Sequence, residues 1–260
     1  MQDSLHEWTW DGSGPRVTAL HGWGGCGLDF ESLALASPNP WRALDLRGHG
    51  LSRPVVDADE HAVEAQRHDL GRALVKEDFL LGYSMGGRLA LQWATAADML
   101  PRGLILVGAH PGIPTGPEKE TRRRWDHEQA SALEAIGARR HMLQWQDQPL
   151  IATQRERMEP RAHQHMVNRR QESHSRSLAA SLRGFGSGTM PDCWDLLEGI
   201  TCPVLLVTGA QDERYTDLAA EMCAKLPTGD LLTVPDAGHA AHLENPAAFL
   251  DGLQHWMGGR

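Results

Sequence analysis

The chain has 260 residues, 41% of them hydrophobic, and a formal net charge of −9 at pH 7. This length is typical of a single α/β domain with a substantial core, and the negative charge argues against a nucleic-acid partner. Residues 1–7 lack both a basic start and an apolar run, and no stretch approaches membrane-spanning length. We therefore expect a cytoplasmic protein with no signal peptide and no membrane partner.

The cysteines follow no pattern typical of a disulfide framework or of a metal site. The four of them are Cys26, Cys193, Cys202 and Cys223. Such usage suits a reducing cytosol. The sequence carries no signal for an oligomeric state.

The first predicted strand, residues 16–20, leads into a glycine-rich loop at 21–27 that begins His-Gly. Such a loop after an early strand supplies one backbone N–H of an oxyanion hole, and the N–H of Trp23 is the candidate here. The same glycines also spell G-x-G-x-x-G, and Asp45 follows at a distance that a dinucleotide site tolerates. The oxyanion loop is preferred, because a dinucleotide site would leave the serine, aspartate and histidine described below without a role.

Residues 82–86, Gly-Tyr-Ser-Met-Gly, have the form G-x-S-x-G. An apolar segment typical of a buried strand precedes them at 78–81, and helical spacing follows at 87–94. A serine on the tight turn between strand and helix is pushed out of the backbone, and the flanking glycines relieve the crowding. Ser84 is therefore the candidate catalytic serine, and the N–H of Met85 is the second oxyanion donor. A chance pattern in a glycine-rich chain is the alternative.

Strands alternate with helices up to about residue 110: after the first strand, around Val17, come a strand near Leu44, a helix around 62–75, the segment at 78–81 and a strand at 103–107. From residue 111 to about 190 no segment is strand-like and several are helical. An insertion after a mid-sheet strand would form a helical lid above Ser84. The chain is thus divided into a first core part, a lid and a second core part, at residues 1–111, 112–190 and 191–260.

The lid differs from the body in charge. Residues 112–190 hold 12 Arg and one Lys against nine acidic residues, so their net charge is +4 and that of the remaining chain is −13. Most of these arginines are expected on solvated helix faces. A basic lid over an acidic body nevertheless predicts a pocket for a small anionic molecule, because guanidinium groups bind carboxylates in bidentate fashion.

Two late strands, at 204–209 and 231–234, are each followed by a candidate partner for the serine. Asp212 and His239 lie in loops just past the carboxyl ends of these strands, where open α/β sheets place their active sites. Their order along the chain, after Ser84, is that of a Ser-Asp-His triad. Asp236 is a rival for the acidic position, because it lies close to the histidine.

His242 lies three residues after His239, and a helix at 246–256 closes the chain. The histidine pair could suggest a metal site, but no acidic or cysteine ligand completes one. His242 is therefore expected in the pocket wall or behind it, and no metal is expected.

Four segments together resemble the 2-succinyl-6-hydroxy-2,4-cyclohexadiene-1-carboxylate synthase family of menaquinone biosynthesis. They are residues 82–88, Gly-Ala-His-Pro-Gly at 108–112, Trp-Gln-Asp-Gln-Pro at 145–149 and the histidine motif at 237–246. The first and last are shared with many α/β-hydrolases, whereas His-Pro-Gly and Trp-x-x-Gln-Pro are more discriminating. The resemblance covers the whole chain. It implies the α/β-hydrolase fold: a mostly parallel central sheet, helices on both faces and a helical lid inserted after a mid-sheet strand.

The family's enzyme is a lyase that removes pyruvate from an enolpyruvyl-cyclohexene precursor bearing a succinyl group and three carboxylates. The resemblance implies that Ser84, deprotonated by His239, acts as general base, and that no metal or organic cofactor is required. It also implies a small anionic substrate and binding roles for Tyr83, Arg88, Arg122, Trp145 and Arg170. The register of two arginine runs stays open, with Arg123, Arg124 and Arg169 as rivals.

Two other functions remain open. A serine hydrolase of an acidic ester or of a C–C bond would use the same triad. A small-molecule receptor on this scaffold would need no complete triad and is the weaker alternative.

Overall fold

A computed structural model describes residues 5–76 and 78–260. The N-terminal positions 1–4, on which part of the signal-peptide expectation rests, lie outside the described residues. Within the described chain the strands form one seven-stranded sheet in the order β1-β3-β2-β4-β5-β6-β7. The strands are β1 (His6–Trp10), β2 (Val17–Leu20), β3 (Trp41–Asp45), β4 (Phe79–Tyr83), β5 (Gly103–Val107), β6 (Val204–Gly209) and β7 (Gly229–Val234). Only β1 runs antiparallel to its neighbour, so the predicted mostly parallel sheet is confirmed.

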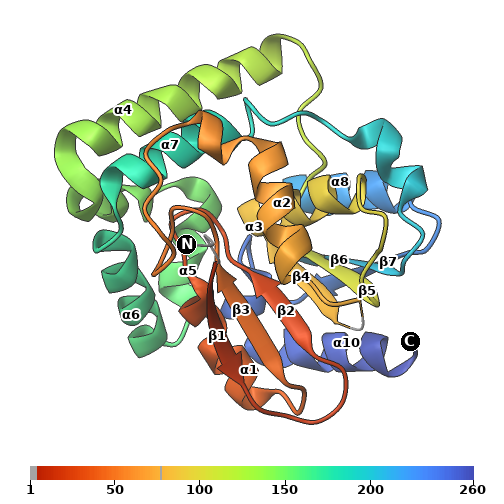
Figure 1. Cartoon of the computed structure of the whole chain (residues 1–260). Helices are drawn as coiled ribbons and strands as arrows, with labels where there is room; N and C mark the ends of the chain where they lie inside the picture. The colour runs from red at the N-terminus through yellow and green to blue at the C-terminus, as the bar shows by residue number, and fades with distance from the viewer. Residues whose placement is uncertain (1–4, 77) are drawn as a thin grey trace.

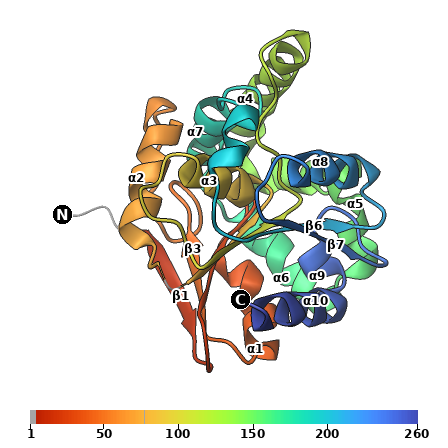
Figure 2. The same cartoon turned by 90° about the vertical axis from the view of Figure 1, so that its right-hand side faces the viewer.

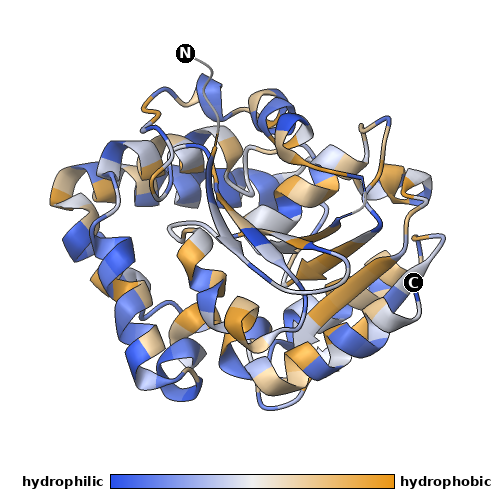
Figure 3. Ribbon diagram, turned by 60° about the horizontal axis from the view of Figure 1, so that its bottom comes forward, coloured by the Kyte–Doolittle hydropathy of each residue, from blue (hydrophilic) through white to orange (hydrophobic). Residues whose placement is uncertain are grey.

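The central strands are continuous apolar runs because both of their faces are covered. Every residue of β4, β5 and β6 is buried. In Figure 3 these strands form the hydrophobic centre, and polar residues lie on the outer faces of the helices. The edge strand β1, which was not predicted from the sequence, alternates between half-buried and exposed residues.

Helices cover both faces of the sheet (Figure 2). The apolar cluster on one face includes residues of α1 (Glu31–Ala36) and α10 (Pro246–Gly258). The cluster on the other face includes residues of α2 (Val63–Ala73), α3 (Met85–Ala94) and α8 (Glu213–Cys223). The α/β-hydrolase architecture that the resemblance implied is therefore the observed one. No helix within the described residues is long and apolar enough to cross a bilayer.

Four α-helices and a 3-10 helix, η3 (Trp194–Gly199), connect β5 to β6, and Figure 1 shows the four α-helices gathered over one end of the sheet. All of residues 112–190 are described, and none of them lies in a strand. The α-helices are α4 (Pro117–Trp145), α5 (Pro149–Arg157), α6 (Pro160–Gln171) and α7 (Ser175–Phe185). We call residues 112–190 the helical insertion.

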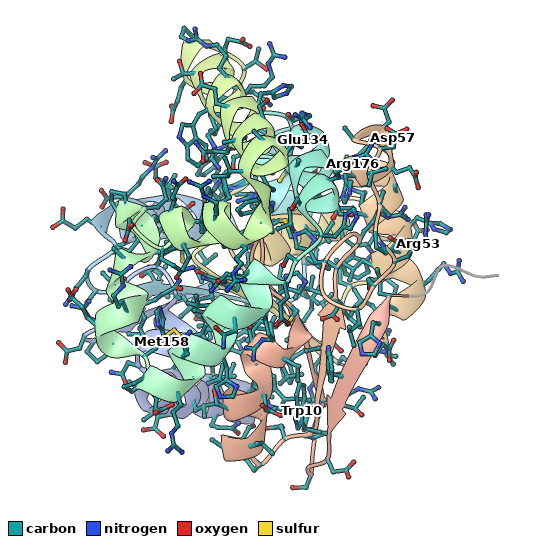
Figure 4. The ribbon with its side chains drawn as sticks, turned by 90° about the vertical axis from the view of Figure 1, so that its left-hand side faces the viewer. Trp10, Arg53, Asp57, Glu134, Met158 and Arg176 are labelled. Carbon is teal, nitrogen blue, oxygen red and sulfur yellow. The ribbon has the colours of Figure 1, made fainter. Side chains whose placement is uncertain are left out.

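The longest helix of the insertion, α4, is broken at Gly137, whose φ of 79° is not helical. The N–H of Ala138, the residue after this glycine, donates to the Ser175 hydroxyl at the start of α7 at 2.8 Å. Glu134, three residues before this break, forms an ion pair with Arg183 of α7 at 2.7 Å. Figure 4 shows Glu134 and Arg176 where the two helices run side by side. These contacts fix α4 against α7 above the sheet.

Candidate active site

Ser84 occupies the turn between β4 and α3, with φ 49° and ψ −107°. This backbone conformation is strained for a residue other than glycine and is typical of a nucleophile elbow. A Cβ at Gly86 would lie 2.4 Å from the carbonyl oxygen of Leu20, and one at Gly82 would lie 2.5 Å from the Cα of Gly87. Only glycine therefore fits on either side of the serine, and the turn presents Oγ at the carboxyl end of the sheet.

The structure brings Ser84, His239 and Asp212 into hydrogen-bonding distance of one another. Ser84 Oγ lies 3.1 Å from His239 Nε2, and His239 Nδ1 lies 2.9 Å from Asp212 Oδ2. His239 and Asp212 are both buried. Because the Asp212 carboxylate only accepts, Nδ1–H donates to it, and Nε2 is left to accept the serine proton. This arrangement is suited to activating Ser84.

Asp236, the rival acidic residue, faces solvent. It lies in a turn after β7 with φ 52°, and its side chain is exposed. Asp212 begins α8 and also accepts the N–H of Tyr215 at 3.3 Å. The geometry therefore favours Asp212 as the partner of His239.

Glu244, which the sequence analysis passed over, holds the backbone on both sides of His239. Its carboxylate accepts the N–H of Gly238 at 2.8 Å and that of Ala240 at 3.2 Å. The hydroxyl of Thr153 in α5 donates to it at 3.0 Å. The histidine loop is thereby tied to the helical insertion.

The predicted oxyanion loop lies against the elbow, since the N–H of Gly86 donates to the carbonyl of His21 at 3.1 Å. Within the described chain, no protein acceptor is assigned to the N–H of Trp23 or of Met85. Trp23 Nε1 donates to Ser181 in α7 at 2.9 Å, which fixes the side chain of this residue. The two backbone groups remain available to a developing oxyanion beside Ser84.

The dinucleotide pattern in the same loop has a packing explanation. A Cβ at Gly22 would lie 2.8 Å from the Tyr83 ring, and one at Gly27 would lie 2.5 Å from Trp8. Gly27 opens only a four-residue 3-10 helix, η1 (Gly27–Phe30). Asp45 accepts the N–H of Gly27 at 2.6 Å and that of Leu51 at 2.7 Å. The glycines and the aspartate thus serve the local fold.

A pocket opens directly above Ser84 and His239. It holds about 780 Å³ of space, with the open solvent at its mouth included. Basic, aromatic and aliphatic side chains share its wall. The lining residues are Gly22, Trp23, Tyr83, Ser84, Arg88, Arg122, Trp125, Trp145, Gln148, Leu150, Ile151, Arg170, Leu182, Tyr215 and His239. All five residues with predicted binding roles therefore line one cavity together with the serine and the histidine.

Arg88 and Arg170 carry buried polar groups without a partner in the described chain. The Nε atoms of both have no hydrogen-bond partner there, although each residue is more than nine-tenths buried. Burial lowers the pKa of Arg88 to about 10, so this guanidinium is still cationic near pH 7. Buried donors of this kind are normally satisfied, so their position in the pocket wall fits an anionic ligand.

The structure also separates the arginines within each run. Arg122 lines the pocket, stacks on Trp125 at 4.9 Å and pairs with Asp126 at 2.8 Å. Arg123 and Arg124 are exposed on the outer face of α4. In the second run, Arg170 is buried in the pocket wall, whereas Arg169 pairs with Asp29 at 2.6 Å.

Several pocket residues were missed by the sequence analysis. Tyr215 packs its ring 4.5 Å from that of His239 and lies in the first turn of α8, three residues after Asp212. That spacing from the candidate acid was a usable signal. Gln148 is the glutamine of the Trp-x-x-Gln-Pro motif but was given no binding role. Trp125 carries no such signal, because its position depends on how the insertion folds over the sheet.

His242 is buried behind the pocket, with its ring 4.5 Å from that of Tyr83. Neither ring nitrogen has a partner in the described chain. Among the described residues no group of three or more His, Cys, Asp or Glu side chains could hold a metal ion. Burial, with a smaller contribution from His239, lowers the pKa of His242 to about 3. This residue is therefore a neutral packing element at neutral pH.

This burial predicts a loss of stability in acid. The native pKa of His242 lies below its unfolded value of about 6.5, so unfolding takes up a proton below that pH. The contribution of neutral His242 to the free energy of unfolding is intact above pH 6.5 and is lost as the pH falls toward 3. The loss is about 2 kcal/mol between pH 6.5 and pH 5. The free energy of unfolding in urea should fall less between pH 7.5 and pH 5 for His242→Leu than for the wild type. An equal fall in the free energy of unfolding for both proteins would contradict the role given to His242. His255→Leu, at an exposed position, is the control.

Comparison with known proteins gives a consistent result. The model of the alpha/beta hydrolase family matches residues 19–251. The chain is similar to the 2-succinyl-6-hydroxy-2,4-cyclohexadiene-1-carboxylate synthase of Pectobacterium atrosepticum, with 31% identity over 94% of each chain. The corresponding synthase of Citrobacter koseri is 30% identical over 92% of each chain.

Solved structures agree at the level of the fold. A structure of MenH from S. aureus superposes with a TM-score of 0.91 and 25% identity, covering 98% of each chain. A thermophilic esterase from Thermogutta terrifontis superposes with a TM-score of 0.80 and 24% identity, covering 98% of this chain and 93% of its own. The esterase shows only that the architecture is shared.

Proposed function

This chain belongs to the alpha/beta hydrolase family and, within it, to the 2-succinyl-6-hydroxy-2,4-cyclohexadiene-1-carboxylate synthases, and from this premise we propose that it is a carbon–oxygen lyase of menaquinone biosynthesis. It eliminates pyruvate from 2-succinyl-5-enolpyruvyl-6-hydroxy-3-cyclohexene-1-carboxylate to give 2-succinyl-6-hydroxy-2,4-cyclohexadiene-1-carboxylate. The observation that carries the proposal is one pocket that combines a serine hydrogen-bonded to a histidine with three guanidinium groups.

The substrate binds through its charges. It bears three carboxylates, and Arg88, Arg122 and Arg170 supply three cationic groups in the pocket wall. Charge-assisted hydrogen bonds to carboxylates are about twice as strong as neutral ones. The rings of Trp145 and Tyr83 cover the apolar parts of the cyclohexene.

The reaction begins with proton transfer. His239 takes the proton of Ser84, and Ser84 removes the proton of the ring carbon next to the succinyl ketone. The electron pair left on that carbon moves onto the ketone oxygen as an enolate, which the N–H groups of Trp23 and Met85 stabilise. Asp212 holds the His239 tautomer and stabilises the imidazolium.

The second step breaks the carbon–oxygen bond. Collapse of the enolate shifts electrons through the ring double bond and expels the enolpyruvyl oxygen at its far end. The ring gains a conjugated diene, and the enol of pyruvate becomes pyruvate by protonation at carbon. No water is consumed, no ester forms on Ser84, and the proton balance closes within the site. No step draws on a metal or an organic cofactor.

The same proposal includes the role of the helical insertion and the location of the enzyme. Residues 112–190 act as a lid that carries Arg122, Trp145 and Arg170 to the substrate, between core parts at 1–111 and 191–260. The four cysteines are free thiols, which fits a reducing cytoplasm.

The primary test is incubation with the enolpyruvyl precursor and a coupled measurement of pyruvate. Rapid pyruvate release supports the lyase, whereas turnover of simple acidic esters alone would support the serine hydrolase. A run in ¹⁸O-labelled water separates the mechanisms, because hydrolysis places solvent oxygen in a product and elimination places none in the ring product. Label in the pyruvate ketone carries no information, because that oxygen exchanges with solvent.

The pocket arginines are expected to differ from their exposed neighbour. Arg88→Ala or Arg122→Ala removes a charge-assisted hydrogen bond, a contribution of roughly 1.5–3 kcal/mol, so kcat/KM should fall on the order of 10–100-fold. Arg123→Ala is the matched control, because Arg123 is adjacent but exposed and paired with Glu120 at 2.9 Å. Pyruvate-release kinetics measure all three. A loss for Arg123→Ala as large as that for Arg122→Ala would mean that α4 presents a different face to the substrate.

A further inference from the structure

Gln154 connects two residues of the pocket wall without reaching the pocket itself. It lies in α5 and is fully buried. Its amide nitrogen Nε2 lies 3.4 Å from the Tyr83 hydroxyl, and its amide oxygen Oε1 lies 3.3 Å from Nη1 of Arg170. The three side chains come from β4, α5 and α6, so they join the elbow to the helical insertion.

The chemistry of Arg170 fixes the orientation of the Gln154 amide. A guanidinium has donors and no acceptor, so the group that faces it must be the amide oxygen. The NH₂ group then faces Tyr83. The opposite orientation would set two donors against each other at Arg170 in a buried environment, where an unpaired donor costs about 1–3 kcal/mol.

This orientation determines the role of the Tyr83 hydroxyl. Its oxygen accepts from Gln154, so its own hydrogen is free for another acceptor. Within residues 5–76 and 78–260 no protein acceptor is assigned to that hydrogen, and Tyr83 lines the pocket. Burial raises the pKa of the phenol, so the hydrogen is retained at neutral pH.

We propose that Gln154 is a positioning residue that makes Tyr83 a hydrogen-bond donor to the substrate, beside the cationic donor Arg170. Tyr83 and Arg170 then recognise the same anionic group, a carboxylate whose two oxygens accept one hydrogen bond from each. The assignment rests on the proposed function for the identity of that carboxylate. The orientation of the hydroxyl does not depend on it.

Gln154→Glu is the informative variant. The carboxylate keeps an acceptor for Arg170 but replaces the NH₂ group with a second acceptor, toward which the Tyr83 hydrogen turns. We expect KM for the enolpyruvyl precursor to rise on the order of 10-fold, as for the loss of one hydrogen bond to a charged group, with a smaller change in kcat. Gln164→Glu is the matched control, because it makes the same charge change at an exposed position of α6.

A double-mutant cycle distinguishes positioning from a general structural effect. Tyr83→Phe should raise KM on the order of 10-fold in the wild type and by less than about 2-fold in the Gln154→Glu background, because the donor is already lost there. Equal effects of Tyr83→Phe in both backgrounds would overturn the proposal.

A spectroscopic measurement needs no substrate and no altered Gln154. The chain has only two tyrosines, so Tyr83 is the only one left in Tyr215→Phe. The intensity ratio of the Raman tyrosine doublet, measured on this variant without substrate, should be that of a hydroxyl that accepts a hydrogen bond. A ratio typical of a hydroxyl that only donates would overturn the proposal. If wild-type protein releases no pyruvate, the proposed function fails while this measurement still decides the orientation of Tyr83.

Discussion

Replacing Ser84 with alanine is expected to lower kcat for pyruvate release by several orders of magnitude, and His239→Ala should do the same. Ser84 carries the only hydroxyl within 3.1 Å of His239 Nε2 among the described contacts. Ser84→Ala therefore removes the base that takes the ring proton, and His239→Ala removes the group that deprotonates this base. In a serine protease such knockouts cost on the order of 10⁶-fold in kcat. Single-turnover measurement of pyruvate formation has the sensitivity for a loss of this size.

Substrate affinity should change far less than kcat in Ser84→Ala, because the guanidinium groups of the pocket are untouched. Ser32→Ala, at an exposed position, is the control for handling and folding. Two results would contradict the general-base role: kcat within 10-fold of the wild type in Ser84→Ala, or an acyl adduct on Ser84 during turnover of the enolpyruvyl precursor. The second result would return the protein to the ordinary serine hydrolases.

A deuterium effect offers independent evidence about the same step. Substrate deuterated at the abstracted ring position should react with lower kcat where proton removal limits the rate. The result concerns the timing of proton transfer, and it complements the ¹⁸O experiment, which concerns the absence of water addition.

The sheet and the elbow could be predicted because their signals are local. The strands β4, β5 and β6 are short apolar runs bounded by polar or glycine residues, as buried parallel strands require. The elbow needs glycine at residues 82 and 86 for steric reasons, and that need is visible in five letters of sequence. Asp212 and His239 were found because parallel strands end at the same edge of a sheet.

Other features depend on tertiary contacts that no local pattern reports. The strand β1 contains Glu7 and two half-buried tryptophans and exists through its pairing with β3. Three consecutive arginines on α4 do not show which of them lies on the inner face of the helix. Only the packing of α4 against α7 shows that Arg122 faces the pocket. Gln154 has an ordinary helical context, and its importance arises from two partners that lie 71 and 16 residues away along the chain.

Asp212→Asn is expected to lower kcat on the order of 10⁴-fold while leaving the fold intact. An asparagine at this position is as good a helix N-cap as aspartate, so the hydrogen bond from the N–H of Tyr215 and the start of α8 survive. The loss arises at His239. The amide can donate to Nδ1, which stabilises the tautomer protonated at Nε2, and that tautomer cannot accept the proton of Ser84.

Asp236→Asn is the matched control for this substitution, since it makes the same chemical change three residues before the histidine. Asp236 is exposed, and its positive φ of 52° is one that asparagine tolerates well. Its kcat should therefore stay within about 2-fold of the wild type, since exposed substitutions of this kind rarely matter. Both variants should melt near the wild-type temperature, so a difference in kcat between them reports on His239. If Asp236→Asn proves more damaging than Asp212→Asn, the carboxylate that orients His239 during turnover is Asp236, and the loop after β7 must rearrange when substrate binds.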